Sequence, residues 1–192
     1  MFSVPARLML AAALATGGAL SLPASASAAP KSCLVGKWKL TKYKMNGNIG
    51  GEIINSQGGG GTRLTIKKKS VVYDFARSER VVTKGKTADG KAYRMVDVYK
   101  KKVTFNSTLT GAKKGSLSLK PKSATGNATF TTTLNGVPAG TTKIAKYYRK
   151  GEIDPFIPVY AQFSCSAKAM GLLMEAEGPE GALASEFYYT RL

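Results

Sequence analysis

The chain contains no histidine, and this absence removes several kinds of site at once. Catalysis by a serine–histidine–aspartate triad or a cysteine–histidine pair needs an imidazole as general base. Zinc sites in proteins need histidines or several cysteines, and this chain has only two cysteines. Asp74, Asp89 and Asp97 do not have the spacing of a metal-binding loop. The sequence therefore predicts no metal, no cofactor and no enzyme activity. The one enzyme alternative left would use serine, lysine or carboxylate side chains.

Long apolar runs are also scarce, and the one that is present lies at the N-terminus. Arg7 precedes an apolar stretch from Leu8 to Leu22, and the small residues Ala26-Ser27-Ala28 follow it. A basic residue, an apolar run of this length and an Ala-x-Ala site together indicate a secretory signal peptide. The run is shorter than the roughly 20 residues of a transmembrane helix and is interrupted by Gly17-Gly18. We therefore expect an extracellular protein without a stable membrane anchor.

With the signal peptide assigned to residues 1–28, residues 29–192 have a length suited to a single domain. This domain contains both cysteines, Cys33 and Cys165. Two cysteines in an exported chain usually pair, because the compartment is oxidising. The sequence predicts a Cys33–Cys165 disulfide, and two buried free thiols are the alternative.

Acidic residues are few: 11 against 29 lysines and arginines, which gives a net charge of +18. The excess of positive charge lies in residues 29–150, whereas residues 151–192 carry more acidic than basic groups. Such a field attracts nucleic acids, anionic lipid head groups or acidic wall polymers. The alternative is that the charge only keeps a secreted protein soluble. Part of it is also expected to be balanced internally, if Glu175, Glu177 and Glu186 lie near Lys37, Lys39, Lys42 and Lys44.

Helical periodicity is nearly absent, and alternation of apolar and polar residues recurs along the chain, as in half-buried strands. Turn sequences such as Asp89-Gly90 and Asn135-Gly136 separate the candidate strands. Many short strands at this spacing predict an all-β fold, either an antiparallel barrel or a β-sandwich. The candidate strands are Gly36–Met45, Arg63–Lys68, Val71–Ala76, Arg80–Lys84, Lys91–Lys100, Lys102–Leu109, Ser116–Lys120, Ala128–Leu134, Lys143–Arg149, Val159–Cys165, Ala169–Glu175 and Glu186–Arg191.

Two longer stretches are predicted to be loops. Gly47–Thr62 is rich in glycine, and Lys150–Pro158 contains two prolines. Within the first, Gly58–Gly61 is interpreted as a mobile loop at the mouth of a barrel. The alternative is that its backbone N–H groups bind an anion.

Five short segments of the domain carry a family resemblance. The segment Gly36-Lys37-Trp38 places a Gly-x-Trp at the first strand, which resembles the lipocalin signature. The stretches Gly58–Ile66 and Val72–Phe75 follow it, and Phe163–Ser166 and Tyr189–Arg191 lie near the end of the chain. Together these segments resemble secreted lipocalin-like proteins of actinobacteria. The resemblance implies an up-and-down β-barrel and covers most of residues 29–192.

The resemblance also implies roles for particular residues. Trp38 would close the base of the barrel, with Arg191 stacked on its ring as a cation–π pair. The inward side chains would form a packed core or line a ligand cavity, because an eight-stranded barrel has a size at which both occur. These possible ligand-lining residues are Leu40, Leu64, Ile66, Tyr73, Phe75, Phe105, Phe130, Phe163, Met174 and Phe187.

Two functional hypotheses follow. The first is a secreted, non-enzymatic protein that binds a small apolar ligand or a partner at the barrel mouth. The second is a basic protein that binds a polyanion or a component of the cell envelope on its outer surface. A filled interior, with lysines gathered on one face, would favour the second. No pattern in the sequence indicates an oligomeric state.

Overall fold

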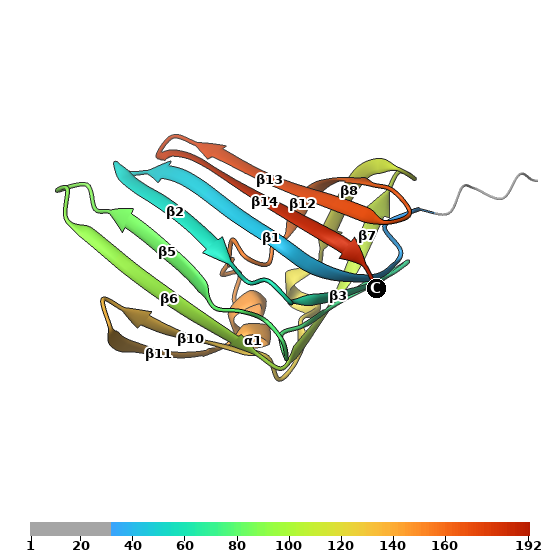
Figure 1. The fold of residues 1–192 in the computed structure, drawn as a ribbon, viewed down its shortest axis with the longest axis horizontal. Coiled ribbons are helices and arrows are strands. Elements are labelled where there is room, and N and C mark those ends of the chain that lie inside the picture. The colour runs from blue at the N-terminus through green and yellow to red at the C-terminus, as the bar shows by residue number, and fades with distance from the viewer. Residues whose placement is uncertain (1–31) are drawn as a thin grey trace, which may run out of the picture.

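The computed structural model describes residues 32–192, so the predicted signal peptide of residues 1–28 lies outside the described residues. Strands make up most of the described chain (Figure 1). Its strands are β1 (Gly36–Ile49), β2 (Glu52–Gly58), β3 (Arg63–Lys67), β4 (Ser70–Asp74), β5 (Val81–Lys86), β6 (Ala92–Lys100), β7 (Lys102–Thr110), β8 (Lys114–Leu119), β9 (Thr125–Gly126), β10 (Thr129–Leu134), β11 (Val137–Lys143), β12 (Tyr160–Cys165), β13 (Ala169–Gly178) and β14 (Gly181–Arg191). A 3-10 helix, η1 (Pro121–Ser123), and one α-helix, α1 (Ile144–Arg149), complete it.

Eight of these strands close into an antiparallel barrel. Their order around the barrel is β1, β14, β13, β12, β8, β7, β4 and β3, and β3 pairs again with β1. Apart from the strands inserted between them, this order follows the chain, as in an up-and-down barrel. The predicted all-β antiparallel barrel is therefore confirmed, and the β-sandwich alternative is wrong.

The first strand shows why the sequence folds this way. In β1 the side chains of Trp38, Leu40, Tyr43 and Met45 are buried, and the lysines between them are exposed. Successive side chains of a strand point to opposite faces, so this alternation puts the apolar set in the barrel. The pairing with β14 shifts register between Leu40 and Lys42, which keeps Tyr43 and Met45 inside.

β1 pairs with two different strands along one of its edges. Its residues Gly36–Lys39 pair with β3, whereas Lys44–Ile49 pair with β2. From β2 the sheet continues through β5, β6, β10 and β11 (Figure 1). We call these five strands the arm. The arm extends the barrel wall at one end and gives the molecule its elongated shape.

The prediction that Gly47–Thr62 is a loop is wrong over most of its length. β1 runs on to Ile49, and β2 occupies Glu52–Gly58. Asn and Gly have poor intrinsic strand preference. Here tertiary pairing overrides that preference, because β1 is hydrogen-bonded to β14 on one side and β2 on the other.

The glycine segment after β2 is pinned by hydrogen bonds and is not a free loop at a mouth. The Gly59 N–H donates to the Arg80 carbonyl (3.3 Å), and the Gly61 N–H donates to the Leu40 carbonyl (2.9 Å). These N–H groups are therefore not available to an anion. Gly59 has φ +66°, and a Cβ added there would lie 2.2 Å from the Phe156 ring. Only glycine fits this position.

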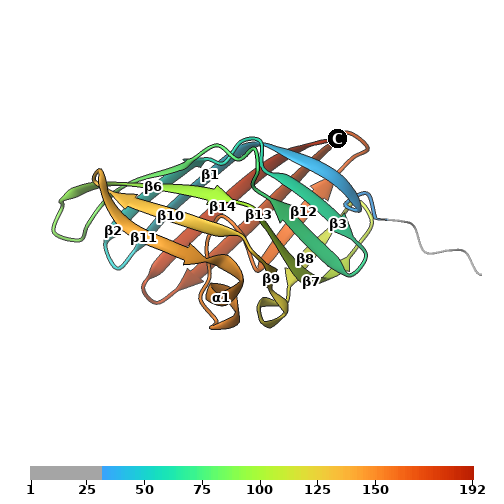
Figure 2. The same ribbon diagram turned by 90° about the horizontal axis from the view of Figure 1, so that it is seen from below.

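The prediction of a strand over Lys143–Arg149 is wrong, because Ile144–Arg149 form the helix α1. The buried side chains Ile144, Ala145 and Tyr148 lie on one face of this helix. α1 joins the arm to the barrel (Figure 2): the Tyr147 ring lies 5.8 Å from Phe130 of β10, and the Tyr148 ring lies 5.0 Å from Phe105 of β7.

The segment Lys150–Pro158 has no helix or strand, as predicted, but it does not stay at the surface. Phe156 and Ile157 are buried in the core. The Phe156 ring centroid lies 4.8 Å from that of Tyr99 and 5.0 Å from that of Tyr43. We call residues 150–158 the plug, because they fill the space between arm and barrel with an aromatic side chain.

Candidate functional site

The residues expected at the barrel base lie together. Trp38 is fully buried, and its indole Nε1–H donates to the Leu34 carbonyl (2.8 Å). The Arg191 guanidinium carbon lies 4.4 Å from the centre of the Trp38 ring, and Arg191 is the register partner of Trp38. The guanidinium also donates to the Cys33 carbonyl (2.6 Å). This arrangement packs the Trp38 ring between the segment before β1 and the last residue of β14.

The Cys33–Cys165 disulfide is formed, as predicted. It joins the segment before β1 to the last residue of β12. Both backbone N–H groups donate to the same turn, Cys33 to Ala112 O and Cys165 to Lys113 O, each at 2.9 Å. A disulfide of this kind indicates an oxidising compartment.

Eight of the ten residues expected to line the interior are buried in the hydrophobic core, whereas Phe130 lies on β10 of the arm and only packs against that core. These eight are at most 4% exposed, while Phe130 and Met174 are partly buried. Around Phe156 the rings pack edge-on or tilted, with Phe75 and Phe187 at 6.3 and 6.4 Å. Such spacing is typical of a packed aromatic core. Phe156 of the plug is itself part of this core.

A polar group is buried within this aromatic core. Asp154 of the plug is 8% exposed; its carboxylate accepts a hydrogen bond from the Tyr99 hydroxyl (2.7 Å) and one from the Phe156 N–H (2.9 Å). The Tyr148 hydroxyl donates to the Ile157 carbonyl (2.6 Å) and accepts from the Asp154 N–H (3.1 Å). These bonds fix the path of the plug.

Burial raises the pKa of Asp154 to about 6, against the lowering effect of its two hydrogen bonds, and the nearby Asp97 raises it further. Burial also raises the pKa of Asp97, although the Thr132 hydroxyl donates to its carboxylate (2.5 Å). Both carboxyls therefore resist ionisation in the folded chain. The raised pKa of Asp154 therefore links the stability of the plug to pH.

We expect stability to fall as pH rises because of Asp154. Between its ordinary value of 3.8 and about 6, the folded chain holds a proton that the unfolded chain has lost. This proton contributes about 3 kcal/mol to the free energy of unfolding. The contribution is complete below pH 3.8 and is lost as the pH rises to about 6. In Asp154→Asn this dependence is expected to disappear. Urea unfolding from pH 4 to 7 measures the difference between the two proteins; parallel curves would contradict it.

The outer surface of β1 carries a row of cations. Lys37, Lys39, Lys42 and Lys44 are all exposed, and standard strand geometry spreads them over about 24 Å. Within residues 32–192 the two salt bridges are Lys91–Asp89 (2.7 Å) and Lys102–Asp74 (3.1 Å). The four β1 lysines are thus not neutralised by ion pairs. We call them the β1 lysine row.

The internal balance expected from three glutamates is only partly present. Glu186 is the register partner of Lys44, but the two do not form a salt bridge among the described residues. Glu175 and Glu177 are paired with Ala184 and Ala182, further along the sheet from the lysine row. The positive field of β1 therefore stays largely uncompensated.

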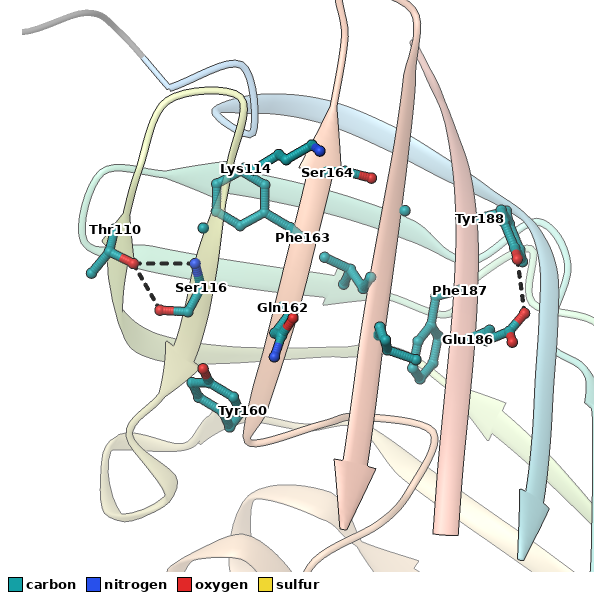
Figure 3. Close-up of a pocket in the computed structure, with 14 residues that line it drawn as sticks. Thr110, Lys114, Ser116, Tyr160, Gln162, Phe163, Ser164, Glu186, Phe187 and Tyr188 are labelled. Carbon is teal, nitrogen blue, oxygen red and sulfur yellow. Dashed lines mark hydrogen bonds between the residues drawn. The ribbon is translucent and has the colours of Figure 1, made fainter.

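A groove of about 720 Å³ adjoins this row on the outside of β8, β12, β13 and β14 (Figure 3). Two tyrosines flank it: Tyr160 is 51% exposed and Tyr188 is 45% exposed. Gly171 lies between their strands, so no side chain rises from this part of the floor. The Tyr188 hydroxyl donates to Glu186 (2.8 Å), and Lys42 Nζ lies 5.5 Å from the Tyr188 ring. The groove and the β1 lysine row are therefore continuous.

Sequence patterns reveal only some of these residues. The apolar run Phe156-Ile157 inside a predicted loop is the one signal for the plug. The groove has no such signal, because Tyr160, Gly171 and Tyr188 become neighbours only through the pairing of β12, β13 and β14.

No protein-family model, curated protein or solved structure matches this chain. The likeness to lipocalin-like proteins thus rests on the sequence motifs and on the barrel. Among residues 32–192, no helix is long and apolar enough to cross a membrane, and no three potential ligand side chains cluster as a metal site would require.

Proposed function

We propose that this chain is a secreted, non-enzymatic binding protein that holds an anionic polymer on the β1 lysine row. The observation that carries the proposal is the row itself: four exposed lysines on one strand face, none of them in a salt bridge within the described residues. A linear array of cations binds a linear polyanion by releasing its counterions. The disulfide supports an oxidising, extracellular setting.

The neighbouring strands add to this face. Arg63 of β3 is the register partner of Lys39, and Lys84 and Arg94 are partners on β5 and β6 of the arm. Asn46 and Asn55 stand between Lys44 and this pair on the same outward side. The positive potential thus continues from the barrel onto the arm.

The interior favours this proposal over a small apolar ligand at the barrel mouth. Phe156 packs against Tyr43, Tyr99 and Phe187, and the hydrogen-bonded Asp154 holds it there. A ligand would have to displace the plug and expose the buried carboxyl's partners. The outer surface needs no such rearrangement.

Neutralising the row should weaken binding strongly. We expect the combined variant Lys37→Gln, Lys39→Gln, Lys42→Gln and Lys44→Gln to bind long-chain polyphosphate roughly 100-fold more weakly at low salt, because four cation contacts are lost. The side chains are exposed, so the fold should be retained. Fluorescence anisotropy with labelled polyphosphate measures the affinity.

The matched control removes the same charge from the side of the molecule that carries η1 and α1. Lys120→Gln, Lys122→Gln, Lys146→Gln and Lys150→Gln change four exposed lysines there. This control should lose much less affinity than the β1 variant. Equal losses would show that net charge alone matters, and a wild-type chain that does not bind polyphosphate would refute the proposal.

A further inference from the structure

The groove beside the β1 lysine row has features that an electrostatic surface alone does not need. Residues that are register partners on neighbouring strands form rows across the groove. One row runs from Lys42 through Tyr188, Gly171 and Ser164 to Lys114. Cations thus stand at both ends, with an aromatic ring, a bare floor and a hydroxyl between them; Figure 3 labels Tyr188, Ser164 and Lys114 of this row.

The next row adds the uncharged polar side chains of Gln162 and Ser116, beside the charged Lys44 and Glu186. It runs from Lys44 through Glu186, Leu173 and Gln162 to Ser116. Among residues 32–192, the side chains of Gln162 and Ser164 form no hydrogen bond with the protein, and both are exposed. An amide and a hydroxyl with free donors and acceptors are therefore presented to whatever enters the groove.

The two tyrosines give the groove its length. Tyr160 precedes Ser164 by four residues on β12, and Tyr188 lies two strands away from Ser164 through Gly171. Standard strand geometry then separates the tyrosine Cα atoms by about 16 Å. This span suits several linked rings better than one small molecule.

We infer that the groove binds sugar rings, so that the anionic polymer is an acidic polysaccharide; this inference rests on the proposed function. A sugar ring has a face of C–H groups that packs on the negative face of a tyrosine ring. Its hydroxyls bond to amides and hydroxyls such as those of Gln162 and Ser164. Its acidic substituents reach the lysines that border the groove, Lys42, Lys44 and Lys114. A polyphosphate has nothing to place on the tyrosines.

Gly171 allows the groove to be blocked without removing a contact. A Cβ added there would lie 3.6 Å from the Ser164 hydroxyl and 4.0 Å from the Phe187 carbonyl, which is ordinary contact. Gly171→Leu should therefore fold and fill the floor. Tyr160→Ala and Tyr188→Ala remove the ring platforms, while Tyr160→Phe and Tyr188→Phe keep the rings and serve as rescue variants.

The test compares hyaluronate oligosaccharides with polyphosphate as probes for the full chain. Each tyrosine-to-alanine variant and Gly171→Leu should bind hyaluronate about 5- to 10-fold more weakly and polyphosphate as the wild type does. The phenylalanine variants should keep most of the hyaluronate affinity. The β1 lysine variant should lose both probes.

Three results would overturn the inference in different ways. If groove variants bind hyaluronate normally while the lysine variant loses both probes, the surface is purely electrostatic and only the proposed function survives. If neither probe binds the wild type, both proposals fall. If the wild type is a dimer in sedimentation and Gly171→Leu is a monomer, the groove is a contact between copies of this chain and not a saccharide site.

Discussion

Removing the Cys33–Cys165 disulfide is expected to lower the free energy of unfolding by about 5 kcal/mol in the chain-entropy model. The two cysteines are 132 residues apart, so the bond restricts a long loop of the unfolded chain. The native positions change little, because both backbone N–H groups stay hydrogen-bonded to the turn at Ala112 and Lys113.

The measurement is urea unfolding of the double variant Cys33→Ser and Cys165→Ser, followed by circular dichroism. The oxidised wild type and the wild type in reductant are the references. The reduced wild type and the serine variant should unfold at similar, lower urea concentrations. If all three midpoints coincide, the bond does not stabilise the fold.

Trp38→Ala is expected to lower the free energy of unfolding by about 3–5 kcal/mol, because it leaves a large hole in the hydrophobic core. Trp38 is 0% exposed. Its substitution also removes the indole hydrogen bond to the Leu34 carbonyl and leaves that carbonyl without this partner. Trp38 is the sole tryptophan of the chain, so unfolding of the variant must be followed by circular dichroism.

Arg191→Ala separates packing from the cation–π contact. Arg191 is exposed on one side, so its loss should cost only about 0.5–1 kcal/mol from this contact. The double variant should lose less free energy of unfolding than the two single variants lose together, since each single substitution already removes the same contact. Strict additivity would show that the guanidinium does not stabilise the Trp38 ring.

The barrel strands were predictable because their evidence lies within each segment. The alternation in β1, or Leu64 and Ile66 in β3, can be read from a few consecutive residues. In contrast, β1 pairs with β3 at one end and with β2 at the other, and such pairing between separate segments leaves no local pattern in the sequence. The composition of Glu52–Gly58 therefore predicts a loop, although its pairing with strands on both sides makes it a strand.

The helix and the plug show a different difficulty. The segment Ile144–Arg149 is short and rich in β-branched and aromatic residues, which favours a strand. Its buried positions 144, 145 and 148 follow a helical period, but one and a half turns give a weak signal. The burial of Asp154 depends on Tyr99 as a partner, 55 residues away in the sequence.

The central claim is that the β1 lysine row binds a polyanion through its charges. The direct test is the slope of log K against log [salt] for polyphosphate, for the wild type and the four-lysine variant. We expect a steep negative slope for the wild type and a slope smaller by about 3 for the variant, since four contacts are lost. A wild-type slope near zero, or one that the four substitutions leave unchanged, would contradict the claim.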